Sequence, residues 1–137
     1  MSSKHIFRPI LGITLIGLSI IILLTGCSGQ KNSQDAPGAV QAYLKALTDK
    51  DQNQMINLSC AAWEAQAKQE YDSFAAVKLT LQDVSCKQSG QDASYTLVTC
   101  QGSILASYGT EDLKLELADR VFRAVQERGE WRMCGYQ

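Results

Sequence analysis

The stretch that decides the fold is residues 77–108, VKLTLQDVSCKQSGQDASYTLVTCQGSILASY. It begins with apolar residues at every second position, namely Val77, Leu79 and Leu81. Alternation with a period of two is typical of a β-strand that buries one face. We therefore expect a sheet to begin here.

Further along the same stretch, the alternation changes phase and then pauses. It slips at residues 82–83, so that Val84 continues it, and such a slip usually marks a β-bulge. Residues 88–92, QSGQD, are typical of a turn. Residues 95–108 then predict a long second strand, which Gly102 can bend.

The rest of the chain predicts two more antiparallel strands. A turn at residues 108–110 leads to a third strand from about residue 113 to residue 126. Residues 127–130, ERGE, predict a tight hairpin into a fourth strand over residues 131–136.

Three helices are expected before the sheet. Asp35 can cap the first helix, and Pro37 suits its first turn because proline lacks an N–H. Asp51 can cap a short second helix, and Ser59 a third that ends at residues 72–73. Three helices followed by four antiparallel strands predict an α+β domain whose curved sheet wraps the helices.

Two motifs resemble the NTF2-like (cystatin-like) superfamily. One is Tyr43-Leu44-Lys45-Ala46-Leu47 followed by the acidic Asp49-Lys50-Asp51, and the other is the closing hairpin Gly129-Glu130-Trp131-Arg132-Met133-Cys134. The resemblance covers about residues 36–137 and implies three helices packed on a curved four-stranded sheet. It does not imply one activity, because this fold holds enzymes, binding proteins and spacers.

The beginning of the chain predicts export and lipidation. A basic start, an apolar run and the motif LTGC at residues 24–27 resemble a bacterial lipoprotein signal. We expect residues 1–26 to be removed, Cys27 to carry the lipid, and residues 27–35 to form a flexible tether. The alternative is an uncleaved membrane anchor. Both place the remaining domain on the extracytoplasmic side of the cell membrane or outer membrane.

Composition excludes several kinds of site. The only histidine, His5, lies in the predicted signal peptide, so the mature domain cannot use Ser/His/Asp or Cys/His catalysis or an imidazole metal site. The charges are scattered without a basic stripe, which argues against nucleic-acid binding. No CxxC spacing suggests zinc, and we expect no metal or cofactor. Four arginines lie late in the chain, and Glu127 and Glu130 largely neutralise them, so we interpret them as a solvated face of mixed charge: Arg120, Arg123, Arg128 and Arg132. The alternative is a small patch that binds an anionic ligand.

Four further cysteines predict two disulfides in an oxidising compartment, with buried reduced thiols as the alternative. The length of the third helix returns Cys60 to the end of the sheet that holds Cys134, so we expect that pair first. Elimination then pairs Cys86 with Cys100. A simple hairpin register separates these two by about six residues, so either bulges reshape the hairpin or this second pairing is wrong.

The resemblance also implies a cone-shaped pocket, whose ionisable and aromatic residues would act on a small apolar substrate. The candidate pocket residues are Tyr43, Trp63, Tyr71 and Trp131, with Tyr95 and Asp119 as further candidates. The first three lie on apolar helical faces, which equally fits core residues with a polar atom at the rim. We assign no catalytic residue.

The sequence therefore predicts a non-enzymatic binding or interaction module, tethered to a membrane by its lipid. Tethering raises the effective concentration of partners near the membrane, either a protein or a small molecule. One alternative is a pocket enzyme that acts on a small hydrophobic molecule. A second alternative is a structural envelope protein that forms a homodimer through its open sheet face.

Overall fold

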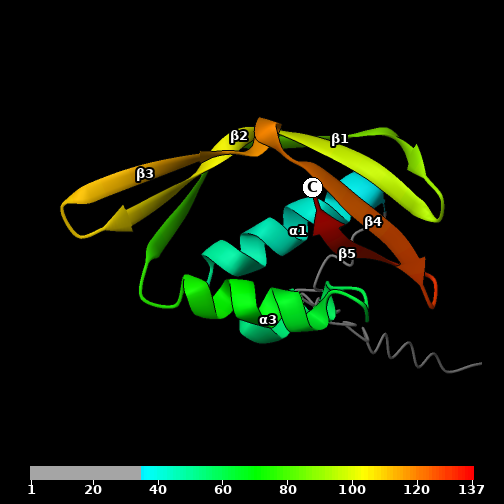
Figure 1. The fold of residues 1–137 in the computed structure, drawn as a ribbon, viewed down its shortest axis with the longest axis horizontal. Helices are drawn as coiled ribbons and strands as arrows, with labels where there is room; N and C mark the ends of the chain where they lie inside the picture. Colours follow the sequence, from blue (N-terminus) through cyan, green and yellow to red (C-terminus); the bar gives the residue numbers. More distant parts are fainter. Residues whose placement is uncertain (1–34) are drawn as a thin grey trace, which may run out of the picture.

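The computed structural model describes residues 35–137; the predicted signal peptide, Cys27 and residues 27–34 of the tether lie outside the described residues. Three helices come first: α1 (Ala36–Thr48), α2 (Gln52–Asn57) and α3 (Glu64–Ser73). An antiparallel sheet follows, consisting of β1 (Lys78–Asp92), β2 (Tyr95–Tyr108), β3 (Glu111–Glu116), β4 (Val121–Glu127) and β5 (Glu130–Tyr136). Figure 1 shows the sheet arching over α1, with α3 on the side of α1 away from the sheet. The expected α+β order of helices before an antiparallel sheet is confirmed.

Helix α1 forms the spine of the core. Asp35 caps it, since its Oδ1 accepts a hydrogen bond of 2.7 Å from the Gly38 N–H, and proline occupies the first turn. Its buried face packs under the sheet and includes Ala39, Val40, Tyr43, Leu44 and Leu47. Each fully buried large aliphatic side chain contributes about 1.5–3 kcal/mol, so this helix anchors the sheet above it.

The expected start of the third helix at Ser59 is wrong. Helix α3 begins at Glu64, because Ser59 lies in a β-bridge and a turn over residues 61–63 precedes the helix. The Ser59 hydroxyl donates back to the Met55 carbonyl at 2.9 Å, and Ser59 forms an isolated parallel bridge with Met133 of β5. Ala67 is the buried residue of α3, so this helix packs through little apolar surface.

The sheet has five strands where four are expected, because the predicted third strand is divided. Strands β3 and β4 both pair with β2, β3 along its second half and β4 along its first. A 3₁₀ turn, η1 (Leu117–Asp119), separates them, and it carries the buried Leu117 into the core. The chain thus leaves the sheet after β3, buries Leu117 in η1, and pairs with β2 again as β4.

The predicted bulge in β1 is confirmed. The register of β1 on β2 shifts between Gln82 and Ser85, and Asp83 adopts a positive φ of 51°. Gly102 lies opposite with a φ of 91°, and a Cβ there would stand 2.4 Å from the Gln82 carbonyl oxygen. Only glycine fits this close approach of two backbones.

The hairpin turn between β1 and β2 lies further along the chain than expected. Residues 88–92 belong to β1, and the turn falls at residues 93–94, between Asp92 and its partner Tyr95. This displacement places Cys86 directly opposite Cys100 in the ladder. The expected separation of six residues was therefore wrong, and the structure joins this pair by a disulfide with Cα atoms 4.0 Å apart.

The β2–β3 hairpin extends beyond the helices as an arm (Figure 1). Tyr108 and Leu113 on this arm are each 51% exposed and are the exposed large apolar side chains of residues 35–137.

Candidate functional site

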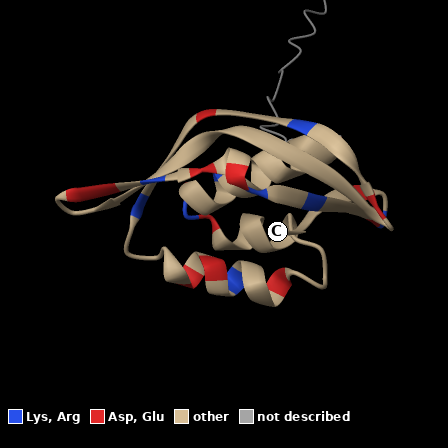
Figure 2. Cartoon of the chain, turned by 45° about the horizontal axis from the view of Figure 1, so that its top comes forward, with Lys and Arg blue, Asp and Glu red and all other residues tan. Residues whose placement is uncertain are grey.

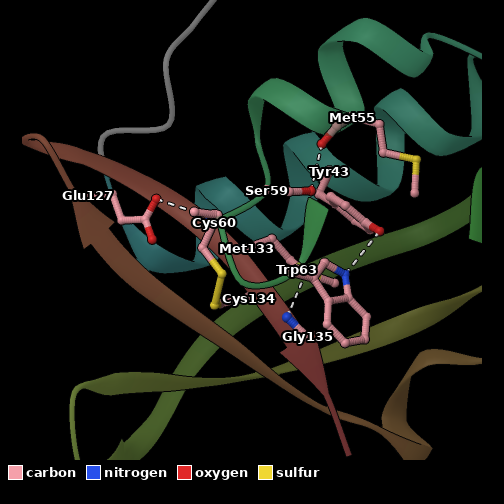
Figure 3. The surroundings of a disulfide bond; sticks show 10 residues. Tyr43, Met55, Ser59, Cys60, Trp63, Glu127, Met133, Cys134 and Gly135 are labelled. Atoms are coloured by element: carbon pink, nitrogen blue, oxygen red, sulfur yellow. Dashed lines mark hydrogen bonds between the residues drawn. A yellow bond between two sulfur atoms is a disulfide. The ribbon is translucent and has the colours of Figure 1, made fainter. Parts of the chain in front are cut away.

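The second disulfide fixes the loop between α2 and α3 to the last strand (Figure 3). Cys60 and Cys134 are joined with Cα atoms 5.2 Å apart. Beside this bond the Met133 N–H donates to the Leu58 carbonyl at 2.7 Å, and the Cys60 N–H donates to the Met133 carbonyl at 2.8 Å. One covalent bond and two backbone hydrogen bonds therefore make this loop part of the sheet.

A surface groove lies between this loop and the β4–β5 hairpin. Its volume is about 430 Å³, and its lining residues are Ser59, Ala61, Glu64, Glu127, Arg128 and Arg132. The groove is not lined by any of the four residues of the expected pocket. Its walls are charged, which sets it apart from a cleft built for an apolar molecule.

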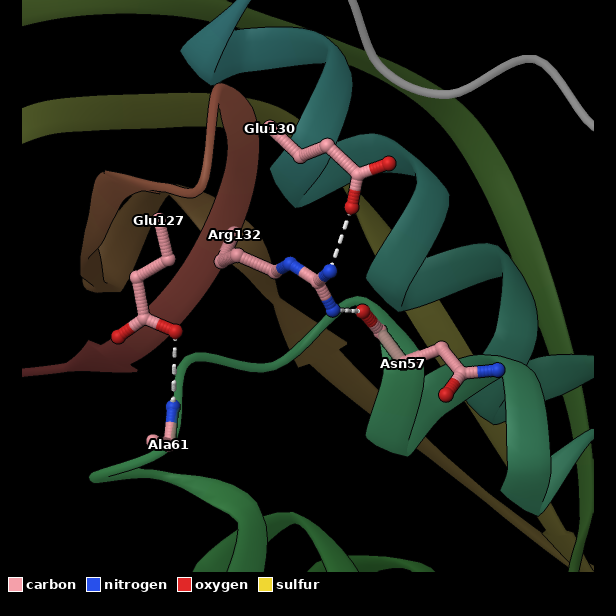
Figure 4. Close-up of polar contacts among 5 residues, drawn as sticks. All are labelled: Asn57, Ala61, Glu127, Glu130 and Arg132. Carbon is pink, nitrogen blue, oxygen red and sulfur yellow. Dashed lines mark hydrogen bonds and ion pairs between the residues drawn. The ribbon is translucent and has the colours of Figure 1, made fainter.

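Two of the charged groove residues bind the hairpin to the loop (Figure 4). The Arg132 guanidinium donates to the Asn57 carbonyl and forms an ion pair with Glu130. A Glu127 carboxylate oxygen accepts a hydrogen bond of 3.2 Å from the Ala61 N–H. The hydrogen bonds of Arg132 and Glu127 join the hairpin to the end of α2 and to the loop that follows it. The ion pair with Glu130 orients the Arg132 side chain. Both walls of the groove are therefore fixed.

The other two charged groove residues, Glu64 and Arg128, form no hydrogen bond or ion pair through their side chains within residues 35–137. Both are exposed. Their charges are therefore available to a ligand.

A second polar cluster lies beneath α3, and we call Tyr43, Glu70 and Tyr136 the α3 clasp. The Tyr43 hydroxyl donates to one carboxylate oxygen of Glu70 at 2.6 Å, and the Tyr136 hydroxyl donates to the other at 3.0 Å. Trp63 completes the cluster, because its indole N–H donates to the Tyr43 oxygen at 3.3 Å. Side chains from α1, α3 and β5 thus meet on one carboxylate.

Both tyrosines of the clasp are held in the neutral form. Burial, followed by the nearby Glu70 carboxylate, raises the pKa of Tyr43 far above its ordinary value. The same two causes raise the pKa of Tyr136 to about 12, against an opposing effect of Arg120. Because neither hydroxyl loses its proton near neutral pH, each serves as a hydrogen-bond donor and not as a base.

The expected pocket residues are not gathered around one cavity. Tyr43 and Trp63 meet in the clasp, but the Tyr71 hydroxyl donates to the Lys50 carbonyl at 3.2 Å. This occurs because α3 turns Ala67 and Glu70 inward and leaves Tyr71 at the side of the helix. Trp131 lies on β5, paired with Gln126, and packs half-buried against the core.

The remaining candidates lie elsewhere. Tyr95 lies under the Arg123 guanidinium, which is 5.8 Å from its ring centre, and Asp119 is exposed in η1. Arg120 similarly lies 4.6 Å from the ring centre of Tyr136. The expected single face of four arginines is therefore divided: two contact aromatic rings, and the other two line the groove. In Figure 2 a basic residue lies among the acidic residues of α3.

Glu70 and Tyr136 were not identified from the sequence. Glu70 follows Trp63 by seven residues and Ala67 by three, so helical spacing places it on the same face as both. This spacing could have predicted that the Glu70 carboxylate faces the core. Tyr136 carried no comparable signal, because its partner comes from a distant helix.

Residues 35–137 contain neither a cluster of metal ligands nor a membrane-spanning helix. No group of three or more His, Cys, Asp or Glu side chains is placed to hold a metal ion in this part of the chain. No helix there is long and apolar enough to cross a bilayer.

Comparisons with known proteins inform the fold and not the activity. No protein-family model and no curated protein matches the chain. The chain is similar in structure to a SEC-C motif containing protein from Rhodopseudomonas palustris, with a TM-score of 0.50 at 10% identity, over 78% of this chain and 80% of that one. It is also similar to the helical cell shape determining protein Pgp2 from Campylobacter jejuni, with a TM-score of 0.49 at 11% identity over 73% of this chain. The chain spans 38% of the length of the Pgp2 chain. At these identities the likeness concerns the fold alone.

Proposed function

We propose that this chain is a lipid-anchored, extracytoplasmic lipoprotein whose residues 36–137 form a non-enzymatic binding module. The observation that carries the proposal is the Cys60–Cys134 disulfide, which fixes one wall of a charged groove. A groove with fixed walls loses little conformational entropy when it binds, and this favours a binding role.

The proposed location is supported by the pairing of the cysteines together with the predicted signal at residues 24–27. Two disulfides among the described residues favour an oxidising compartment, because cytosolic reductants keep such thiols reduced. A lipid on Cys27 would then hold the domain at the outer surface of the cell membrane or in the outer membrane.

The proposed non-enzymatic role is supported by the hydrogen bonds of Glu70 and its two tyrosines. Both carboxylate oxygens of Glu70 accept hydrogen bonds from tyrosines whose pKa values are raised. The role of this cluster is therefore to attach α3 to α1 and β5. An acid or base for catalysis works best with a pKa near the ambient pH.

We also propose the NTF2-like fold for this domain, because helices precede a curved antiparallel sheet and α1 packs in its concave side.

The anchoring part of the proposal is tested by Cys27→Ala. The unaltered chain should remain with the membrane fraction after a high-salt wash, whereas the variant should lose its lipid. N-terminal masses that differ only by the replacement of cysteine with alanine would contradict lipidation.

The binding part is tested in intact cells with a photo-crosslinking amino acid in place of Ala61, which is exposed and lines the groove. A matched control places it at Lys87, which is exposed on β1 at the opposite edge of the sheet. We expect a discrete adduct from position 61 and none from position 87. Equal labelling from both positions would contradict a binding site at the groove.

A second candidate function, homodimerisation in the envelope, is favoured by the half-exposed Tyr108 and Leu113 on the arm. Under that function, Leu113→Asp should convert a dimer to a monomer in light scattering of the detergent-solubilised chain. A monomer before the substitution would exclude it.

A further inference from the structure

We propose that the groove binds a small zwitterion, of the class of free α-amino acids and unblocked dipeptides. The ligand carboxylate would lie at Arg128, and its ammonium group at Glu64. This inference rests on the proposed binding function and names the ligand class for the same groove.

Two of the four charged groove residues are already bound within the protein, and two are not. Glu127 is bound to the Ala61 N–H, and Arg132 is bound to Glu130 and to a backbone carbonyl. These two residues hold the walls. Glu64 and Arg128 remain, one negative and one positive, and neither has a side-chain partner within the described part of the chain.

The two available charges come from opposite walls. Glu64 begins α3, whereas Arg128 lies in the turn between β4 and β5. A ligand that satisfies both must therefore carry opposite charges at its two ends. A dipolar molecule does so, because its carboxylate can accept from the guanidinium while its ammonium donates to the Glu64 carboxylate.

The same arrangement discriminates against ligands with one charge. The four charged lining residues, two acidic and two basic, give the groove no net charge. A simple anion attracted to Arg128 brings no positive group to Glu64, and a simple cation leaves Arg128 unmatched. The specificity arises from the cost of leaving one charged side chain without a partner as much as from the ion pair that does form.

Size and rigidity agree with a small ligand. The groove volume of about 430 Å³ lies at the lower end of the range for small-molecule sites, which is roughly 300–1,000 Å³. The disulfide and the backbone bridge between Ser59 and Met133 hold the loop wall in place before any ligand arrives. Because both available side chains are exposed, we expect weak binding, in the millimolar range.

The test uses four dipeptides that differ only in their end charges. L-alanyl-L-alanine carries both charges, its N-acetyl derivative only the negative one, its amide only the positive one, and the doubly blocked form neither. Each is titrated into the full-length chain in detergent while the backbone amide signals of Ala61 and Glu64 are followed by NMR. We expect the free dipeptide to bind, and each singly blocked form to bind about two- to fivefold more weakly, since one ion pair with an exposed side chain is lost.

Two substitutions assign the ends of the ligand. Glu64→Gln should abolish the preference for the free dipeptide over its N-acetyl form, and Arg128→Gln the preference over its amide. Matched controls are Glu111→Gln on the arm and Lys87→Gln on β1, both exposed and remote from the groove, and they should bind as the unaltered chain does. Unchanged amide signals outside the groove verify that each variant is folded.

Three results would overturn the inference. Binding of the N-acetyl dipeptide as tightly as the free one would show an anion site, and would leave the binding module itself intact. Equal binding of all four forms would show that end charges are not recognised. No shift at Ala61 or Glu64 with any form would exclude this ligand class, while crosslinking at position 61 judges the binding function separately.

Discussion

The α3 clasp offers the sharpest test of the physical account. Glu70→Ala removes the carboxylate that accepts from Tyr43 and Tyr136, but takes little apolar area out of the core. Helix α3 buries only Ala67, so its attachment depends on these hydrogen bonds more than on apolar packing. We therefore expect a larger loss of stability than a half-buried glutamate would ordinarily cause.

The magnitude follows from the burial of the two hydroxyls. Tyr43 is 0% exposed, and its hydrogen bond to a charged acceptor contributes about 1.5–3 kcal/mol. Water can replace the acceptor for the half-buried Tyr136, so that bond contributes about 0.5–1 kcal/mol. The free energy of unfolding should fall by about 2–4 kcal/mol, a large share of the roughly 5–15 kcal/mol of a typical domain.

The assay is urea unfolding followed by circular dichroism, with Gln69→Ala as the matched control. Gln69 is the neighbouring exposed residue on α3, and its replacement should change stability by less than about 0.5 kcal/mol. A double-mutant cycle with Tyr43→Phe isolates the shared hydrogen bond, and its coupling energy should be about 1.5–3 kcal/mol. A cost for Glu70→Ala equal to that of Gln69→Ala, or a coupling energy near zero, would refute this reasoning.

Three further predictions use the same unfolding assay. Because the pKa of Tyr136 is raised to about 12 in the folded state, only the unfolded chain loses this proton between the ordinary value of 10.0 and about 12. The free energy of unfolding should fall as the pH rises through this window, and Tyr136→Phe should remove part of the fall; an unchanged slope would contradict the assignment. Gly102→Ala should cost more than about 2 kcal/mol, because its φ is 91° and the new Cβ would stand 2.4 Å from a carbonyl oxygen. Gly109→Ala, with nothing within 4 Å and a φ of 78°, should cost only about 1 kcal/mol, so equal costs would exclude the close approach as the cause. Replacing Cys60 and Cys134 together by serine should cost about 4 kcal/mol, since they are separated by 74 residues; a loss below about 1 kcal/mol would show that the loop is held without the disulfide.

Local signals in the sequence predicted the elements that depend on neighbouring residues. The Asp35 cap and the proline that follows it specify the start of α1, and the structure shows that cap. The phase slip at residues 82–83 specified the bulge, because side chains on a strand must alternate faces wherever the register continues. In both places the responsible interaction lies within a few residues of the signal.

The errors occurred where a distant contact overrides the local pattern. Ser59 is a good helix cap by itself, but pairing of its segment with Met133 holds it extended. The alternation of apolar residues over residues 113–126 did not predict the turn at η1. This turn buries Leu117 in the core. The same limit applied to Tyr136 in the clasp.

The groove illustrates this limit for function. Arg128 and Glu64 are separated by most of the sheet in the sequence, and nothing in their local patterns distinguishes them from solvated surface charges. Both line the groove because the α2–α3 loop is joined to β5. The four arginines could therefore be assigned to two separate places only from the fold.

The central claim is a lipid-anchored domain stabilised by two disulfides outside the cytoplasm. The most direct measurement is intact and peptide mass spectrometry of the chain extracted from its native membrane, with and without reduction. The account predicts an N-terminal peptide that begins at Cys27 with an added diacylglyceryl mass, and two linked peptides, one joining Cys60 to Cys134 and one joining Cys86 to Cys100. An unmodified N-terminus at Met1, or four cysteines that alkylate without reduction, would contradict it.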